Sequence, residues 1–131
     1  MGDGIRNPGY VRGVQIKTGR QTFVAADTTA DKTILAVPAS KKFLRVKFLM
    51  VTLNGASVAT TANYFQIKDG AATLRLEIPV PVAATTRVDV IPLPMDSPLR
   101  LSQDNALIGN MVAALTAGEL RVYAIGYEDN D

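Results

Sequence analysis

Apolar and polar residues alternate with a period of two along most of this sequence. The clearest example is TLRLEI (73–78), in which three aliphatic residues alternate with Thr, Arg and Glu. Successive side chains of a β-strand point to opposite sides of a sheet, so this period indicates strands rather than helices. Turn signals such as Asn54-Gly55 and Asp69-Gly70 separate about eight to ten short segments of this kind. The sequence therefore predicts an all-β protein.

The length of 131 residues corresponds to one domain, which can fold without a metal or a disulfide. We expect two antiparallel sheets packed as a β-sandwich, and a core of eight strands favours the jelly-roll type. An immunoglobulin-like sandwich is the alternative. We expect residues 1–25 to form an extended N-terminal arm or hairpin, with its turn at Lys17–Arg20, and residues 26–131 to form the sandwich domain.

The segment KKFLRVKFLMVTLNG (41–55) predicts a strand whose second face changes from polar to aliphatic. A sandwich sheet usually keeps one face in water, so the aliphatic half of that face needs a cover. The strand at 120–127 is mixed in the same way. Either the N-terminal arm or a second subunit provides the cover, and burying three aliphatic side chains is worth on the order of 5 kcal/mol. The predicted subunit interface consists of Leu49, Val51, Leu53, Tyr123, Ile125 and Tyr127.

The chain contains neither Cys nor His, which excludes disulfides, thiolate zinc sites and Ser-His or Cys-His nucleophile pairs. Most Asp residues fall at turns, where the side chain caps local backbone amides. Glu128, Asp129 and Asp131 lack the spacing of a calcium loop and are expected to form a frayed tail. We therefore expect a protein that is not an enzyme and that holds no metal or cofactor.

Charge is distributed unevenly although the net value is only +2. Residues 1–25 carry four basic residues and one acidic residue, whereas the remainder carries ten and eleven. Four basic residues in this segment are too few to predict nucleic-acid binding. The longest apolar run, FLMVTL, is too short to span a membrane. We expect the arm to contact a neighbouring chain or an acidic partner through Arg6, Tyr10 and Arg12.

The segment LSQDNALIGNMVAALTAGELRVYAIGYED (101–129) resembles the last strands of small virion proteins of tailed bacteriophages. PASKKFLRVKFLMVTLNGAS (38–57) is similar to their central strand. The resemblance implies a capsid decoration or cement protein: a β-rich module, often a homotrimer, that binds the major capsid protein on the outer surface of the virion and bridges capsomers. It implies no catalytic or cofactor residues.

Two other roles remain open from the sequence. Tail and neck proteins of phages share similar sandwiches, so the position on the virion is not fixed by the resemblance. A glycan-binding module is the alternative from a different class, because Tyr123 and Tyr127 share a strand face and could form a small stacking platform.

Overall fold

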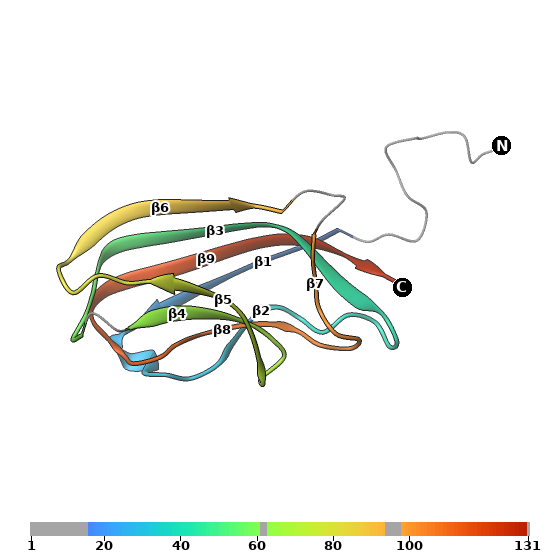
Figure 1. Ribbon diagram of the computed structural model, residues 1–131, viewed down its shortest axis with the longest axis horizontal. Coiled ribbons are helices and arrows are strands. Elements are labelled where there is room, and N and C mark those ends of the chain that lie inside the picture. Colours follow the sequence, from blue (N-terminus) through green and yellow to red (C-terminus); the bar gives the residue numbers. More distant parts are fainter. Residues whose placement is uncertain (1–15, 61–62, 94–97, 131) are drawn as a thin grey trace.

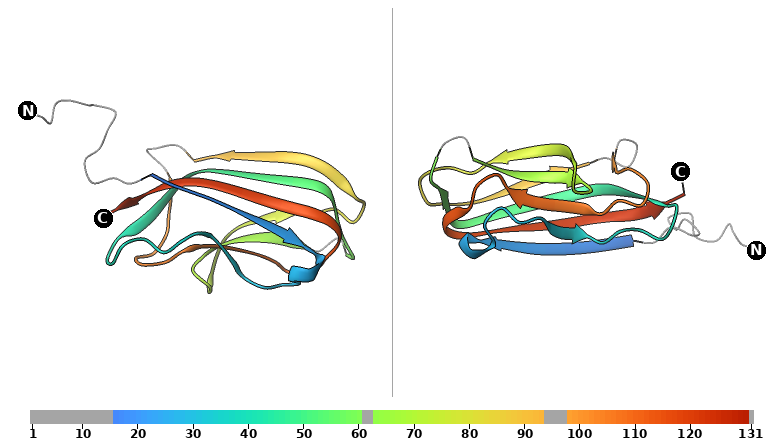
Figure 2. Two further views of the ribbon diagram at one scale, coloured as in Figure 1. Left: turned by 180° about the vertical axis from the view of Figure 1, so that it is seen from behind. Right: turned by 90° about the horizontal axis from the view of Figure 1, so that it is seen from below.

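The computed structural model describes residues 16–60, 63–93 and 98–130. These residues form two β-sheets packed face to face, with one short 3-10 helix (Figures 1 and 2). The elements are β1 (Ile16–Val24), η1 (Ala25–Asp27), β2 (Lys32–Leu35), β3 (Phe43–Val58), β4 (Tyr64–Asp69), β5 (Thr73–Pro79), β6 (Thr85–Pro92), β7 (Leu99–Arg100), β8 (Leu107–Met111) and β9 (Leu115–Asp129).

The strands divide into two sheets, and neighbouring strands in each sheet run antiparallel. The larger sheet has the order β1-β9-β3-β6, with β7 also paired to β3, and the smaller sheet has the order β2-β8-β4-β5. The predicted antiparallel β-sandwich is confirmed. The pairs β4-β5, β3-β6, β2-β8 and β1-β9 are those of a long hairpin rolled up into two sheets, which favours the jelly-roll type.

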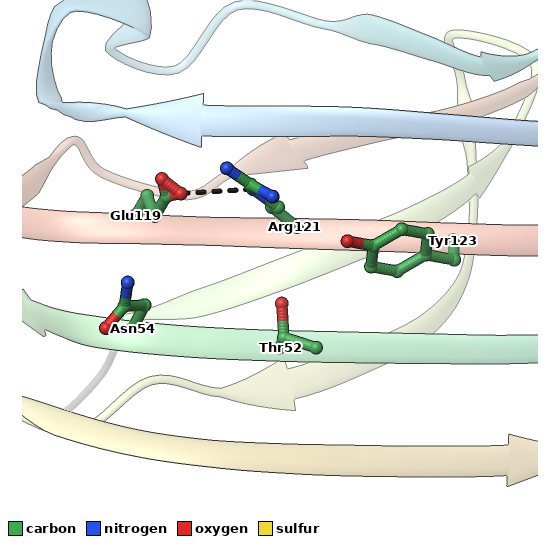
Figure 3. Close-up of a pocket in the computed structure, with 5 residues that line it drawn as sticks. All are labelled: Thr52, Asn54, Glu119, Arg121 and Tyr123. Atoms are coloured by element: carbon green, nitrogen blue, oxygen red, sulfur yellow. Dashed lines mark hydrogen bonds and ion pairs between the residues drawn. The ribbon is translucent and has the colours of Figure 1, made fainter.

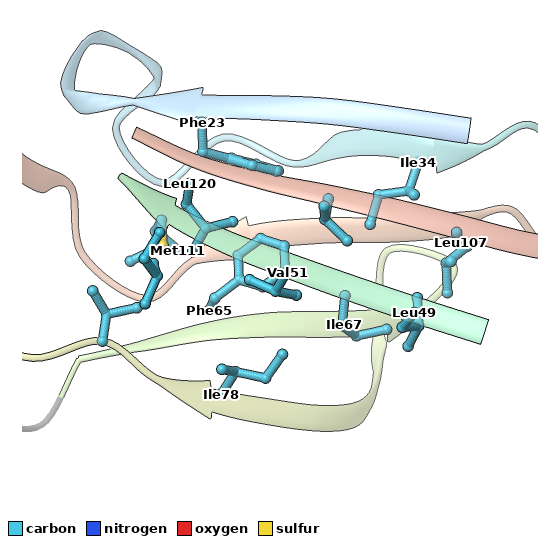
Figure 4. Close-up of a cluster of buried hydrophobic side chains, with 14 of the residues drawn as sticks. Phe23, Ile34, Leu49, Val51, Phe65, Ile67, Ile78, Leu107, Met111 and Leu120 are labelled. Atoms are coloured by element: carbon cyan, nitrogen blue, oxygen red, sulfur yellow. The ribbon is translucent and has the colours of Figure 1, made fainter. Parts of the chain in front are cut away.

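The core lies between the two sheets and is formed by the inward side chains of both (Figure 4). The rings of Phe23 from β1 and Phe65 from β4 meet edge to face at its centre, with centroids 5.0 Å apart. Aliphatic residues such as Ile67, Leu107 and Leu120 surround them and are almost completely inaccessible to solvent. This intersheet packing is the main source of stability for a fold of this kind.

A β-bulge in β3 explains the change of face that the sequence shows between residues 41 and 55. Val46 pairs with Gly126 of β9 and Phe48 pairs with Ile125, so Lys47 is an extra residue without a partner in this ladder. An extra residue reverses which side chains face inward. The inward set therefore passes from Leu44 and Val46, before the bulge, to the odd-numbered residues from Leu49 to Leu53 after it.

The bulge places half of the predicted subunit interface in the core. Leu49, Val51 and Leu53 are at most 1% exposed within the single chain, where they pack against the smaller sheet. Their side chains are therefore unavailable to a second subunit, and the prediction was wrong for these three residues. The prediction assumed that side chains alternate between the two faces along the whole strand, and this alternation reverses at the extra residue.

The predicted hairpin near the N-terminus was also wrong. Ile16–Val24 form one continuous strand that pairs with β9, and Phe23 enters the core. Gly19 is not part of a turn: a Cβ at this position would lie 1.9 Å from the carbonyl oxygen of Ile34, so glycine permits β1 to approach β2 closely. The described part of the predicted arm thus belongs to the sandwich, and residues 1–15 lie outside the described residues.

The acidic C-terminal segment is ordered where the structure describes it. Glu128 is 4% exposed, forms an ion pair with Lys17 at 3.0 Å and accepts a hydrogen bond from the Ala39 N–H. Asp129 forms an ion pair with Arg45. These contacts join β9 to β1 and to the loop before β3, so the expectation of a frayed tail was wrong for Glu128 and Asp129, while Asp131 lies outside the described residues.

Candidate functional site: the outer face of the larger sheet

The outward side of β9 carries the three remaining residues of the predicted interface. Leu120, Val122 and Ala124 face the core, so the alternate residues face away from it. Tyr123 and Tyr127 are half-buried among their neighbours, and Ile125 is 37% exposed. Because β9 lies between β1 and β3, these side chains occupy the middle of the outer face.

The strands beside β9 place further apolar side chains next to these residues. Phe48 and Met50 of β3 pair with Ile125 and Tyr123, and Met50 pairs on its other side with Val90 of β6. Val88 and Val90 are more than half exposed, as is Ile16 at the far edge on β1. We call this set the outer apolar stripe; it consists of Ile16, Phe48, Met50, Val88, Val90, Tyr123, Ile125 and Tyr127.

Among the described residues, the exposure of the stripe is the strongest indication of an interaction site. Scattered apolar residues on a surface are ordinary, but an apolar set that is contiguous across four strands is characteristic of an interaction site. Tyr side chains and Met are also enriched at protein interfaces, where they supply contact area without a fixed charge. The stripe is therefore suited to contact with another protein surface.

A shallow pocket of about 210 Å³ adjoins the stripe at Tyr123 (Figure 3). Its lining is otherwise polar, and Arg121 Nε lies 3.1 Å from the Glu119 carboxylate. Hydrogen bonding to the Tyr123 side chain, followed by the charge of Glu119, raises the pKa of Arg121. The guanidinium therefore stays charged, and the pocket combines one aromatic side chain with a fixed ion pair. It is lined by Thr52, Asn54, Glu119, Arg121 and Tyr123.

The predicted site residues thus fall into three groups by their location. Tyr123, Ile125 and Tyr127 lie together on the outer face, whereas Leu49, Val51 and Leu53 lie in the core. The predicted arm contacts Arg6, Tyr10 and Arg12 lie outside the described residues.

Sequence reasoning missed the partners of Tyr123 and Ile125 on the neighbouring strands. Alternation in β6 separates Val88 and Val90 from Arg87 and Asp89, but it does not say which pair faces outward. Only the register with β3 settles this, because Val90 pairs with the outward Met50. No local sequence signal would have identified these residues.

Other kinds of site find little support in the part of the chain that the structure describes. There, acidic side chains do not gather in groups of three or more that would hold a metal ion. Within the same residues, none of the helical structure is long and apolar enough to cross a membrane.

The fold is similar to that of a solved phage structure. A chain described as "Cyanophage Pam1 capsid asymmetric unit" aligns with a TM-score of 0.52 at 13% sequence identity, over 92% of this chain and 89% of that one. No protein-family model and no curated protein sequence matches this chain. At this level of identity the likeness concerns the fold, and it extends over nearly the whole of both chains.

Proposed function

We propose that this chain is a structural protein of a tailed-phage virion, and specifically a decoration or cement protein on the outer surface of the capsid. The observation that carries the proposal is the outer apolar stripe, which is exposed across four strands of the larger sheet. The fold shared with a chain of a cyanophage capsid unit supports it. So does the resemblance of residues 38–57 and 101–129 to small phage virion proteins.

The mechanism would be mechanical. The stripe, centred on Tyr123 and Ile125, packs against the major capsid protein or a neighbouring copy, and Arg6, Tyr10 and Arg12 add contacts to the shell or that copy. Several such contacts on one oligomer, which the family resemblance predicts to be a trimer, bridge adjacent capsomers. Binding that occurs only in the assembled shell stabilises it by mass action and multivalency. No reaction is required.

Co-sedimentation with purified capsids tests this role. The full chain is mixed with capsids stripped of accessory proteins and with fully decorated ones, and we expect it to pellet only with the stripped particles. Ile125→Asp places a charge in the stripe and is expected to lower the bound fraction at least tenfold. Leu74→Asp is the matched control, because Leu74 is an exposed aliphatic residue of the other sheet, at 46% exposure. Equal binding of both variants would exclude the stripe as the docking surface.

A position on the neck or tail would use the same surface, and it predicts binding to those particles in place of empty capsids. Glycan binding is a separate candidate, which the pocket at Tyr123 favours because it combines an aromatic ring with amide, hydroxyl and charged groups. Saturation-transfer NMR with simple sugars tests it. Signal that is lost in Tyr123→Ala would support a glycan site, and no signal with the intact chain would remove this candidate.

A further inference from the structure

Strand β6 forms one edge of the larger sheet. It pairs with β3 on one side, and within the described residues it has no strand on its other side (Figure 1). It is eight residues long, and its outward residues Val88 and Val90 end the outer apolar stripe. An edge strand of this length presents unpaired backbone groups that are able to pair with another strand.

The register identifies which backbone groups are free. The Leu93 N–H donates to the Lys47 carbonyl at 2.8 Å, in continuity with the pairing of Pro92 opposite Phe48. In an antiparallel ladder, alternate residues direct their N–H and C=O groups to the same neighbour. The odd-numbered residues of β6 therefore bond to β3, and the N–H and C=O groups of Thr86, Val88 and Val90 point away from the sheet.

The charged side chains of β6 are arranged symmetrically about Val88. Arg87 Nε lies 2.9 Å from Asp89 Oδ2, and Arg87 also donates to the Pro79 carbonyl at 2.6 Å. Both side chains point toward the inner side of the sheet, because their partners Leu53 and Val51 are core residues.

We propose that β6 pairs antiparallel with β6 of a second copy of this chain, across a two-fold axis at Val88. In this register Arg87 faces Asp89 of the second copy, and Asp89 faces Arg87 of the second copy. Val88 faces its own counterpart, and Thr86 faces Val90. The free N–H and C=O groups of these three residues then pair with each other, and the larger sheets of the two copies become one continuous sheet.

Charge complementarity is the reason to name a second copy as the occupant. Inward-pointing charges on an edge strand usually prevent association, because they meet like charges or apolar surface. Here the signs are opposite on the two sides of Val88, so a two-fold axis brings opposite charges together. Opposite-charge pairs directly across a ladder stabilise it. The two stripes also become continuous through Val88 and Val90, which adds apolar contact at the same axis.

This contact goes beyond the proposed function and is independent of it. It is an isologous, two-fold contact, and it therefore differs from the three-fold contacts of the trimer that the family resemblance predicts. It is made by the edge of the sheet, whereas the capsid is proposed to bind the outer face. Arg87 and Asp89 are not in the stripe, so changing them separates the two proposals.

Sedimentation velocity of the full chain over a range of concentrations tests the pairing. We expect the mass to rise with concentration to twice that of the smallest unit, whether that unit is the monomer or the trimer that the family resemblance predicts. Arg87→Asp and Asp89→Arg each set like charges opposite one another in the dimer, and each is expected to raise the dissociation constant about tenfold or more. The double variant R87D/D89R restores the complementary signs and is expected to restore dimerisation. The double variant also restores the ion pair within each chain, so an equimolar mixture of the two single variants is the sharper test. In the mixed dimer opposite charges meet across the axis although neither chain regains its own ion pair, so dimerisation of the mixture distinguishes pairing from a general loss of folding.

Val88→Pro is a second probe, because it removes an N–H that points away from β3 and leaves the ladder to β3 intact. Far-UV circular dichroism checks that each variant is folded. A chain that stays monomeric at every concentration would overturn the proposal. So would an oligomer whose dissociation constant is the same in Arg87→Asp, Asp89→Arg and the double variant. Either result would leave capsid binding through the stripe untouched, since co-sedimentation measures it separately.

Discussion

Two groups of Ser102 donate hydrogen bonds to one oxygen of Asp69. Asp69 Oδ2 accepts from the Ser102 N–H at 2.9 Å and from the Ser102 hydroxyl at 3.0 Å. Asn105 and Arg75 donate to the same carboxylate. The Asp69 side chain is completely buried at the end of β4. The donor groups of Ser102 and Asn105 therefore hold the loop before β8 against the smaller sheet, and Arg75 links the carboxylate to β5. A buried carboxylate of this kind is stable only because its oxygens are satisfied.

Replacing Asp69 with Asn is expected to destabilise the fold. The amide turns one acceptor into a donor that faces other donors, and the expected loss is about 2–3 kcal/mol in the free energy of unfolding. Urea denaturation measures it. Asp31→Asn is the matched control, because Asp31 is 38% exposed and pairs with Lys68 at the surface. We expect that change to cost under about 1 kcal/mol. Equal losses would contradict the structural role of Asp69.

Stability is expected to depend on pH through the same carboxylate. Burial alone would raise the pKa of Asp69, but the hydrogen bonds from Asn105, Arg75 and Ser102 outweigh it, so the pKa lies below its usual 3.8. At a pH between the folded and unfolded pKa values, the unfolded chain binds more protons. The stabilisation is therefore complete at neutral pH and is lost as the pH falls below about 4.

Urea denaturation of the intact chain and of Asp69→Asn between pH 7 and pH 2.5 checks this dependence. We expect the intact chain to lose more of its free energy of unfolding on acidification than the variant does. Asp27, whose pKa is lowered chiefly by the Val24 N–H, adds a dependence of the same sign to both proteins. Parallel curves would mean that the Asp69 carboxylate does not have a lowered pKa in the folded state.

The sandwich could be predicted from the sequence because the period of two follows from strand geometry alone. Which face of each strand is buried depends on pairing, and β3 shows why this is harder. The sequence around Lys47 does not mark it as an extra residue, because the bulge is defined only by the pairing of β3 with β9. Of the predicted interface residues, Tyr123, Ile125 and Tyr127 on β9 consequently lie on the outer face, where their role in an interface stays a prediction, whereas the three residues on β3 lie in the core.

Gly19 shows a second limit of sequence reasoning. A glycine between two alternating segments is a turn signal, but it serves equally where two backbones come close, and only the fold separates these roles. The burial of Glu128 is a similar case, because an acidic residue near a chain end gives no sign that Lys17 and the Ala39 N–H will lie beside it.

Gly19→Ala is expected to destabilise the fold by about 2 kcal/mol or more, because overpacking against backbone forces strands to shift. The added Cβ would lie 1.9 Å from the Ile34 carbonyl oxygen, so β1 has to move away from β2. Thermal denaturation measures the loss. Thr18→Ala, at the exposed neighbouring position, is the control and is expected to change the melting temperature little. A harmless Gly19→Ala would contradict the close approach of β1 to β2 at this position.

Leu49 and Ile125 provide the sharpest contrast between core and surface. Leu49→Ala removes a side chain with no solvent exposure and is expected to cost about 2–5 kcal/mol, as in other large-to-small changes in a core. Ile125→Ala, on the outer face, is expected to cost under about 1 kcal/mol in urea denaturation and to weaken capsid binding in co-sedimentation. Leu49→Ala should bind capsids like the intact chain at temperatures where it is folded. The reverse pattern, with a stable Leu49→Ala that no longer binds, would place Leu49 at an interface and contradict the bulge at Lys47.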